Sequence, residues 1–187
     1  MVPEEIATIL KERFGDAVTE VNVGGGHPHV CVTAVAWPDV ARFLRDDARL
    51  KFDWLRCITS IDLLEDDSFA AVYDLHATEP PDRPDGLWRE RHEFAVKVTV
   101  SRGDPRIGSV ADLWPAADWH EREAYDLMGI VFEGHPDSVE GSDGPHPRRI
   151  LCPDDWEGHA LRKDYEFPLE YHGIPCVTEY GQVRPQH

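Results

Sequence analysis

The four cysteines of this 187-residue chain are too scattered to suggest a metal site. Cys31, Cys57, Cys152 and Cys176 include no C-x-x-C pair, the spacing typical of structural zinc and iron–sulfur ligands. Most of the ten histidines stand alone or beside Pro and Gly. We therefore expect free thiols in a reducing compartment, and no zinc or cluster bound by this chain.

Positive charge is scarce as well. Lys and Arg total 19 against 36 Asp and Glu, which gives a formal net charge of −17, and no basic stretch stands out. A surface of this charge repels phosphate backbones. These numbers exclude nucleic-acid binding as a function.

Long apolar runs are also missing. No window approaches the roughly 18 apolar residues that span a bilayer, and the N-terminal MVPEEIATIL lacks the basic and apolar regions of a signal peptide. We expect a protein that stays in the cytoplasm and associates with a membrane only through partner proteins.

Motifs of nucleotide binding and serine hydrolysis are absent too. There is no G-x-S-x-G, and Gly24–Gly26 has neither the G-x-G-x-x-G pattern nor a P-loop Lys-Ser/Thr. The three glycines join two predicted strands, so we interpret them as a hairpin turn.

The hydrophobic periodicity predicts an α+β core domain over residues 1–132. Helices are expected at 3–14, from Trp37 onward, and at 116–128, and short strands at 18–23 and 29–35. Three longer strands show alternation of period two: Leu55, Cys57, Thr59, Ile61 and Leu63; Phe69 to Ala77; Phe94 to Val100. This pattern favours an antiparallel meander sheet with helices packed on one face.

Smaller features complete this prediction. Residues 79–86 are interpreted as a long hairpin connection, and Ser109 as the cap of a short turn. Gly129 is placed to end the third helix, and the core candidates on that helix are Trp119, Ala124 and Leu127.

Beyond Phe132 the periodicity disappears. Residues 133–187 hold seven of the fifteen prolines and no convincing helix or strand. The composition is not that of a disordered segment, because it includes Trp156, Tyr165, Phe167 and Tyr171. We predict a long extended C-terminal arm that buries its aromatic side chains on a partner subunit.

The densest polar run, Trp119–Asp126, allows several interpretations. On a helix, Glu123 and Asp126 share a face, and His120 lies one turn before Glu123. Two carboxylates and an imidazole could bind a metal or perform acid–base catalysis. An Arg122–Asp126 ion pair on an interface or a solvated face is the simpler interpretation, since no H-E-x-x-H or second carboxylate motif completes a metal site.

A second run, RRILCPDDWEG followed by LRKDY, begins at Arg148. Guanidinium groups bind carboxylates through two parallel hydrogen bonds, and Trp and Arg are common anchors of interface centres. The run favours a protein interface, with an ordinary polar loop as the alternative.

Together the two runs resemble the signature of the 30 kDa subunit family, the C subunit of proton-pumping NADH:quinone oxidoreductase (respiratory complex I). The family pattern reads E-R-E-x-x-D, then G-I-x-F-x-G-H-P, then R-R-I-L, and later D-W-x-G with L-R-K-D-Tyr/Phe. This chain matches it in order, from Glu121 to Tyr165. One departure is the Gly/Ser/Asp-rich insertion 137–147, which we expect to be a solvent loop following His135.

The resemblance implies a scaffolding subunit without catalytic residues and without a cofactor of its own, FMN and Fe–S clusters lying in partner subunits. It would bind the hydrogenase-large-chain-like D subunit and neighbouring Fe–S subunits, at the cytoplasmic side of the inner membrane. The matching residues are then expected at subunit interfaces: Glu121, Arg122, Glu123, Asp126, His135, Arg148, Arg149, Asp155, Trp156, Arg162, Lys163, Asp164 and Tyr165.

Two alternatives remain open. The same module serves membrane-bound hydrogenase-like and other donor:quinone complexes, so the electron donor is not fixed by the signature. A free-standing acid–base or metal enzyme would instead use Glu121, Glu123 and Asp126 together with His135.

Overall fold

A computed structural model describes residues 1–78, 92–141 and 144–176. The predicted hairpin connection 79–86 and the last residues of the predicted arm, 177–187, lie outside these ranges. The main elements follow the chain in this order: α1 Pro3–Phe14, β1 Val18–Asn22, β2 His29–Thr33, α2 Trp37–Asp46, β3 Trp54–Leu63, β4 Ser68–Ala77, β5 His92–Ser101, β6 Arg106–Gly108, α3 Ala116–Met128 and β7 Val131–Glu133. Within the described ranges, none of the helices is long and apolar enough to cross a membrane.

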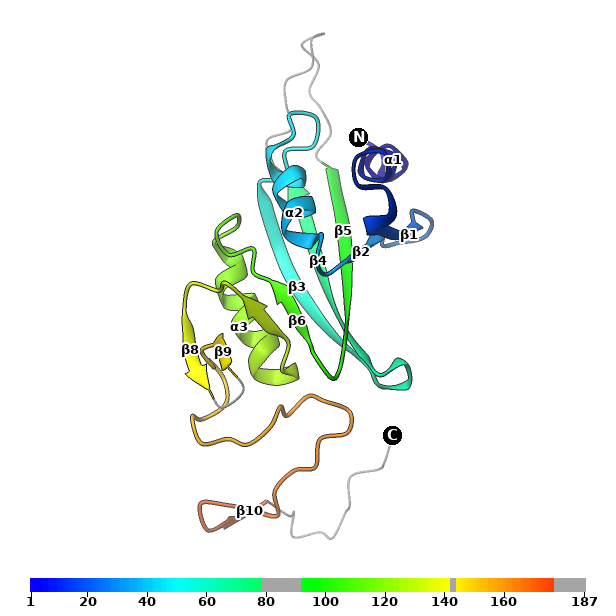
Figure 1. Cartoon of the computed structure of the whole chain (residues 1–187). Helices are drawn as coiled ribbons and strands as arrows, with labels where there is room; N and C mark the ends of the chain where they lie inside the picture. The colour runs from blue at the N-terminus through cyan, green and yellow to red at the C-terminus, as the bar shows by residue number, and fades with distance from the viewer. Residues whose placement is uncertain (79–91, 142–143, 177–187) are drawn as a thin grey trace.

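The central sheet has the strand order β1-β2-β5-β4-β3 (Figure 1). Strands β3, β4 and β5 form the expected antiparallel meander, and β1 and β2 form the hairpin predicted around the three glycines. The sheet is not antiparallel throughout, because β2 pairs with β5 in parallel, Val30 opposite Val96. The hairpin β1–β2 adds to the free edge of the meander, and α2 carries the chain from there across to β3 at the opposite edge.

A bulge at Arg56 reverses the predicted faces of β3. The register shifts between Leu55 and Cys57, so Leu55 is buried while Cys57 and the alternate residues after it leave the core face. Ile58 and Asp62 face the core instead, and Ile61 is 36% exposed. Because side chains alternate with a period of two, one extra residue exchanges the two faces of the strand. The alternation in the sequence therefore predicts the wrong face beyond Arg56.

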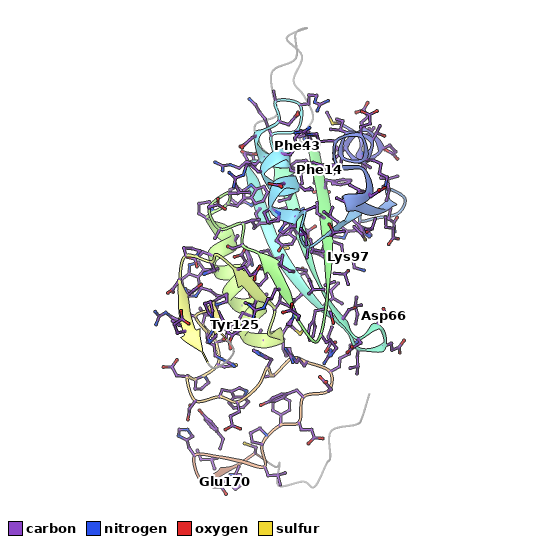
Figure 2. The ribbon with its side chains drawn as sticks, in the orientation of Figure 1. Phe14, Phe43, Asp66, Lys97, Tyr125 and Glu170 are labelled. Atoms are coloured by element: carbon purple, nitrogen blue, oxygen red, sulfur yellow. The ribbon has the colours of Figure 1, made fainter. Side chains whose placement is uncertain are left out.

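The helices cover one face of this sheet, as predicted, and the fold is of the α+β class (Figures 1 and 2). Trp37 of α2 packs on Tyr73 of β4 with ring centroids 4.2 Å apart. Phe14 of α1 meets Phe43 of α2 edge to face at 5.5 Å. Apolar residues of α1, α2, α3 and the sheet belong to one buried cluster, which provides most of the hydrophobic stabilisation.

Helix α3 buries a stripe that only partly matches the expected one, since Ala124 is buried as predicted. Ala117, Glu121 and Ala124 face inward, at the spacing of successive helical turns. Trp119 lies off this stripe and is 61% exposed, so its assignment to the core is wrong. The helix ends at Gly129 as predicted, with the left-handed φ of +77° that only glycine adopts without strain.

The segment after β7 contains short strands that the sequence did not indicate. The insertion 137–147, predicted as a loop, includes an antiparallel pair, β8 Ser138–Gly141 and β9 Gly144–Pro147. A second pair, β10 Glu170–Tyr171 with β11 Ile174–Pro175, follows near the end of the described residues. These strands are two to four residues long, too short to show hydrophobic periodicity. The rest of the segment runs without regular structure past the end of α3 (Figure 1).

Candidate functional site

The residues of the two signature runs meet where α3 ends and the C-terminal segment crosses it. Residues 148–165 return to α3 and to the ends of β3 and β5, more than twenty residues away along the chain. We call this region the junction. Its contacts are polar and partly buried, and they fasten the segment to the core.

The carboxylate of Asp126 is the centre of the junction. It is fully buried and accepts hydrogen bonds from three consecutive backbone N–H groups, those of Ile150 (3.0 Å), Leu151 (2.7 Å) and Cys152 (3.0 Å). Arg149 adds an ion pair at 3.1 Å. Burial by itself raises the pKa of Asp126, but these N–H groups outweigh burial and the pKa is lowered. The ionised carboxylate thus holds the turn 149–152 in place.

A second buried carboxylate, Asp62 of β3, anchors the segment further along. It accepts the backbone N–H of Lys163 at 2.8 Å and pairs with the guanidinium of Arg102. Arg102 also donates to Asp164 at 2.6 Å and lies over the Phe69 ring, 4.5 Å from its centroid. The Arg102 and Asp62 side chains are only 9% and 2% exposed. Their charges are compensated within the chain, as a buried ion pair requires.

Between these two anchors the segment packs directly on the end of α3. The Leu161 N–H donates to the carbonyl of Leu127 at 3.0 Å, and Arg162 Nε donates to the carbonyl of Met128 at 2.8 Å. These bonds satisfy carbonyl groups that the end of a helix leaves without intrahelical donors. A Cβ atom on Gly129 would meet the side-chain ends of Arg162 and His159, which would have to shift, and the φ of +77° at this position also favours glycine.

On the inner side of α3, Glu121 is fully buried and accepts hydrogen bonds from Ser109 Oγ (2.6 Å) and the Val110 N–H (2.8 Å). Burial raises the pKa of Glu121 to about 7, although these two hydrogen bonds lower it. Ser109 also caps the turn after it, as predicted, by accepting the Ala111 N–H at 3.2 Å.

His135 is buried against the first turns of α3. Its Nε2 lies 3.1 Å from the carbonyl oxygen of Asp118 and 3.9 Å from Glu121 Oε2. Its Nδ1 accepts the Asp137 N–H at 3.1 Å. Nε2 also lies 3.3 Å from the carboxylate oxygen Oδ1 of Asp118. Both ring nitrogens of His135 therefore have partners, and the residue ties the start of the insertion to α3.

Arg122 and Glu123 lie on the outer face of α3. The predicted Arg122–Asp126 ion pair is wrong, because Asp126 turns inward to bind the C-terminal segment. Arg122 instead stacks on Trp119, 4.9 Å from the ring centroid, and donates to the Arg148 carbonyl at 3.1 Å. Glu123 is exposed.

The three carboxylates of the suggested catalytic cluster do not converge. Glu121 binds the turn at Ser109, Asp126 binds residues 149–152, and Glu123 faces outward. In the described ranges, no group of three or more His, Cys, Asp or Glu side chains could hold a metal ion. The cysteines are all free, and burial, the largest cause, raises the pKa of Cys31, Cys57 and Cys152. A raised thiol pKa keeps these side chains protonated and unreactive near neutral pH.

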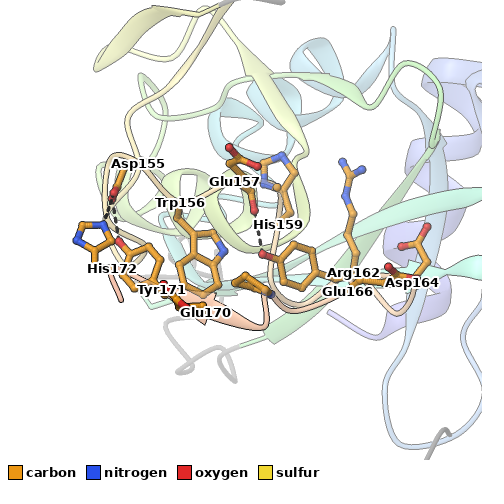
Figure 3. Close-up of a pocket in the computed structure, with 13 residues that line it drawn as sticks. Asp155, Trp156, Glu157, His159, Arg162, Asp164, Glu166, Glu170, Tyr171 and His172 are labelled. Carbon is orange, nitrogen blue, oxygen red and sulfur yellow. Dashed lines mark hydrogen bonds and ion pairs between the residues drawn. The ribbon is translucent and has the colours of Figure 1, made fainter. Parts of the chain in front are cut away.

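The remaining signature residues line a pocket beyond the junction (Figure 3). Trp156 stacks near Tyr165, with centroids 6.5 Å apart, and lies 5.2 Å from the ring of Tyr171. Tyr165 donates its hydroxyl to the Glu157 carbonyl at 2.9 Å, and Tyr171 donates to Asp155 at 2.8 Å. These bonds fix the orientation of both tyrosine rings.

Sequence reasoning missed Asp62 and Arg102, which form the second anchor. Asp62 was hidden because the predicted alternation placed it on the solvent face of β3. A charged residue on the core-facing side of a strand indicates a buried ion pair, since such a group needs a buried partner. The bulge at Arg56 had to be known before this pattern could be recognised.

Comparisons with known proteins agree with the resemblance seen in the sequence. The family model "Respiratory-chain NADH dehydrogenase, 30 Kd subunit" matches residues 30–171. The C subunit of NADH-quinone oxidoreductase from Chloroherpeton thalassium is 47% identical over 174 residues, which cover 92% of this chain and 65% of that protein. The Chlorobium phaeobacteroides protein of the same name is 41% identical over 167 residues, covering 89% of this chain and 90% of its own length.

Solved structures share the fold. A trypsin-resistant fragment (1–134) of Nqo5 superposes with a TM-score of 0.56 at 32% identity, covering 71% of this chain and 98% of the fragment. A chain of an archaeal membrane-bound sulfane sulfur reductase gives a TM-score of 0.65 at 24% identity, covering 87% of this chain and 85% of that chain. With the family model spanning most of the sequence, the chain belongs to the family of the 30 kDa subunit of respiratory-chain NADH dehydrogenase.

Proposed function

We propose that the chain is a scaffolding subunit of an NADH:quinone oxidoreductase of the complex I type, without catalytic residues or a cofactor of its own. Its C-terminal segment is an arm that binds the neighbouring hydrogenase-large-chain-like D subunit. FMN and the Fe–S clusters reside in partner subunits, and electrons pass from NADH to quinone through them. The assembly attaches the chain to the cytoplasmic side of the inner membrane.

The observation that carries this proposal is the exposure of apolar side chains along the segment. Large apolar residues there remain open to solvent although the backbone is held by the junction: Leu151 (60%), Leu161 (55%), Phe167 (49%), Leu169 (78%) and Ile174 (68%). Anchored backbone with outward apolar side chains is typical of a surface that another protein covers. The ionic residues of the signature shape this surface from within.

A solved relative supports the division into core and arm. The Nqo5 fragment that matches this fold is trypsin-resistant and ends at its residue 134. The proposal likewise requires residues 1–132 to resist proteolysis better than residues 133–187 do.

The test is co-purification from detergent-solubilised membranes of a host that depends on the tagged chain. The double variant Leu161→Asp and Leu169→Asp places charges on the exposed apolar surface of the segment. Each leucine at a buried interface contributes roughly 1.5–3 kcal/mol, which is more than tenfold in association. We expect loss of the partner subunits from the purified material.

The matched control is Val2→Asp with Val35→Asp, two exposed apolar residues outside the segment (54% and 93%). It should leave co-purification unchanged. Equal loss in both double variants, or no loss in either, would contradict docking through the segment. Subtilisin digestion of the free chain adds a second test, since the segment beyond Gly134 should be removed before the core.

A related donor:quinone or hydrogenase-like complex is the second candidate. The fold shared with the sulfane sulfur reductase chain favours it, since one scaffold serves more than one respiratory membrane complex. The co-purified partners distinguish the two. A large subunit that keeps nickel-ligating cysteines indicates a hydrogenase, whereas FMN-containing and NADH-binding partners indicate the main proposal.

A free-standing enzyme is the third candidate. Its three carboxylates bind different segments of the chain or face outward, which counts against a shared catalytic centre. Bound metal or turnover in the isolated chain would restore this candidate.

A further inference from the structure

The pocket beyond the junction combines aromatic walls with negative charge (Figure 3). It has a volume of about 800 Å³ and is lined by the rings of Trp156, Tyr165 and Tyr171. We call it the aromatic pocket. Its size is that of a site for a side chain or a small ligand rather than a packing defect.

Charge around the aromatic pocket is strongly unbalanced. Five carboxylates line it against the single guanidinium of Arg162 among the described residues. Two of the five are already paired, Asp155 with His172 and Asp164 with Arg102. The three carboxylates of Glu157, Glu166 and Glu170 are exposed at its rim. They create a negative potential at the entrance.

The aromatic rings reinforce this preference. The face of an aromatic ring carries partial negative charge and attracts a guanidinium or ammonium group. The rings are held in place before any ligand enters, since Tyr165 is tied to the Glu157 carbonyl and Tyr171 to Asp155. A pocket built in advance loses little conformational entropy on binding.

We propose that the aromatic pocket binds an arginine or lysine side chain from a segment of the neighbouring subunit. The inference rests on the proposed function, in which this part of the chain docks on a partner. It deepens that function by assigning the partner's chemistry: a basic side chain lies against the faces of the rings and faces the rim carboxylates.

The experiment follows the indole signal of Trp156 by NMR in the full chain labelled with ¹⁵N. The chain has six tryptophans, and a Trp156→Phe variant identifies the signal. The probes are the capped tripeptides acetyl-Gly-Arg-Gly-amide and acetyl-Gly-Gln-Gly-amide. We expect the arginine peptide to shift the Trp156 signal saturably, with a Kd on the order of a millimolar, and the glutamine peptide to leave it unchanged.

Charge variants test the rim. Glu166→Gln with Glu170→Gln should weaken binding of the arginine peptide by about three- to tenfold. The matched control, Glu65→Gln with Glu140→Gln, also removes two exposed negative charges but none from the pocket, and should bind as the unmodified chain does.

Three outcomes would overturn the inference: no shift of Trp156, equal shifts with both peptides, or equal weakening in both double variants. Co-purification by the unmodified chain does not depend on these titrations. A failed titration with intact co-purification would therefore reject the aromatic pocket and leave the scaffolding function standing. Conversely, if the Leu161→Asp, Leu169→Asp variant keeps its partner subunits, the proposed docking is rejected whatever the peptide titrations show.

Discussion

The carboxylate of Asp126 accepts the backbone N–H of Leu151 at 2.7 Å, across 25 residues of sequence. A helix residue thereby fixes the path of a segment that has almost no regular structure. Several ionic residues of the family signature, among them Asp126, Arg149 and Asp164, bind within the chain. They position the surface that we propose for the partner.

The first prediction concerns this carboxylate. Asp126→Asn removes the charge that three N–H groups and Arg149 stabilise, and leaves the Arg149 guanidinium partly buried without its anion. We expect a loss of about 3 kcal/mol in the free energy of unfolding, together with faster tryptic cleavage after Arg149. Urea denaturation and timed digestion measure the two effects. Asp154→Asn makes the same chemical change at an exposed position and should alter neither.

The second prediction is a dependence of stability on pH that comes from Glu121. Its pKa rises from 4.5 in the unfolded chain to about 7 in the folded one, chiefly through burial. The folded state therefore favours the protonated form, and the stability contribution present below pH 4.5 is lost as pH rises to about 7. The total change is roughly 3 kcal/mol.

Glu121→Gln should abolish this dependence because the amide stays neutral at every pH. Urea unfolding between about pH 5 and about pH 8 measures it, with Glu123→Gln as the exposed control on the same helix. As pH rises, the unmodified chain should lose free energy of unfolding, whereas the Glu121→Gln variant should not. The difference between the two free energies should therefore shift in favour of the variant. Parallel pH profiles for the two proteins would show that Glu121 is not the titrating group.

The third prediction separates backbone strain from a steric clash. Gly129→Ala places a Cβ atom at a φ of +77° and against the side-chain ends of Arg162 and His159. Gly134→Ala places one at the same φ of +77° with no atom within 4 Å. We expect about 1 kcal/mol of destabilisation for Gly134→Ala, from backbone strain alone. Gly129→Ala should be worse by about a further 1–3 kcal/mol and should loosen the segment in proteolysis. Equal losses would mean that the two side chains move aside freely.

The fourth prediction concerns Glu123 and Arg162 in the assembled complex. We expect Glu123→Gln and Arg162→Ala to reduce the amount of assembled complex on native gels, most of all together. Turnover per assembled particle should stay near normal. Arg162 also supports the fold through Met128, so Glu123, which is exposed, is the cleaner probe of the partner. Full assembly with turnover reduced a hundredfold would refute the scaffold and restore a catalytic interpretation.

The local elements and the family could be predicted from the amino-acid sequence. The i, i+3, i+4 spacing of Ile6, Ile9 and Leu10 predicts α1, and Gly129 marks the end of α3. The ordered motifs from Glu121 to Tyr165 indicated the family that the comparisons confirm. These features depend on neighbours within a few residues of one another, so the linear sequence contains the information that specifies them.

Features that depend on residues far apart in the sequence could not be predicted and became visible only in the folded chain. The parallel pairing of β2 with β5 places Val30 beside Val96, and the bulge at Arg56 turns Asp62 into the core. Asp126 could be interpreted as a surface ion-pair partner until its donors, the N–H groups of residues 150–152, were located beside it. Long-range hydrogen bonds and strand pairings depend on how the whole chain packs and which groups it buries. The local spacing of residues in the sequence contains no information on these contacts.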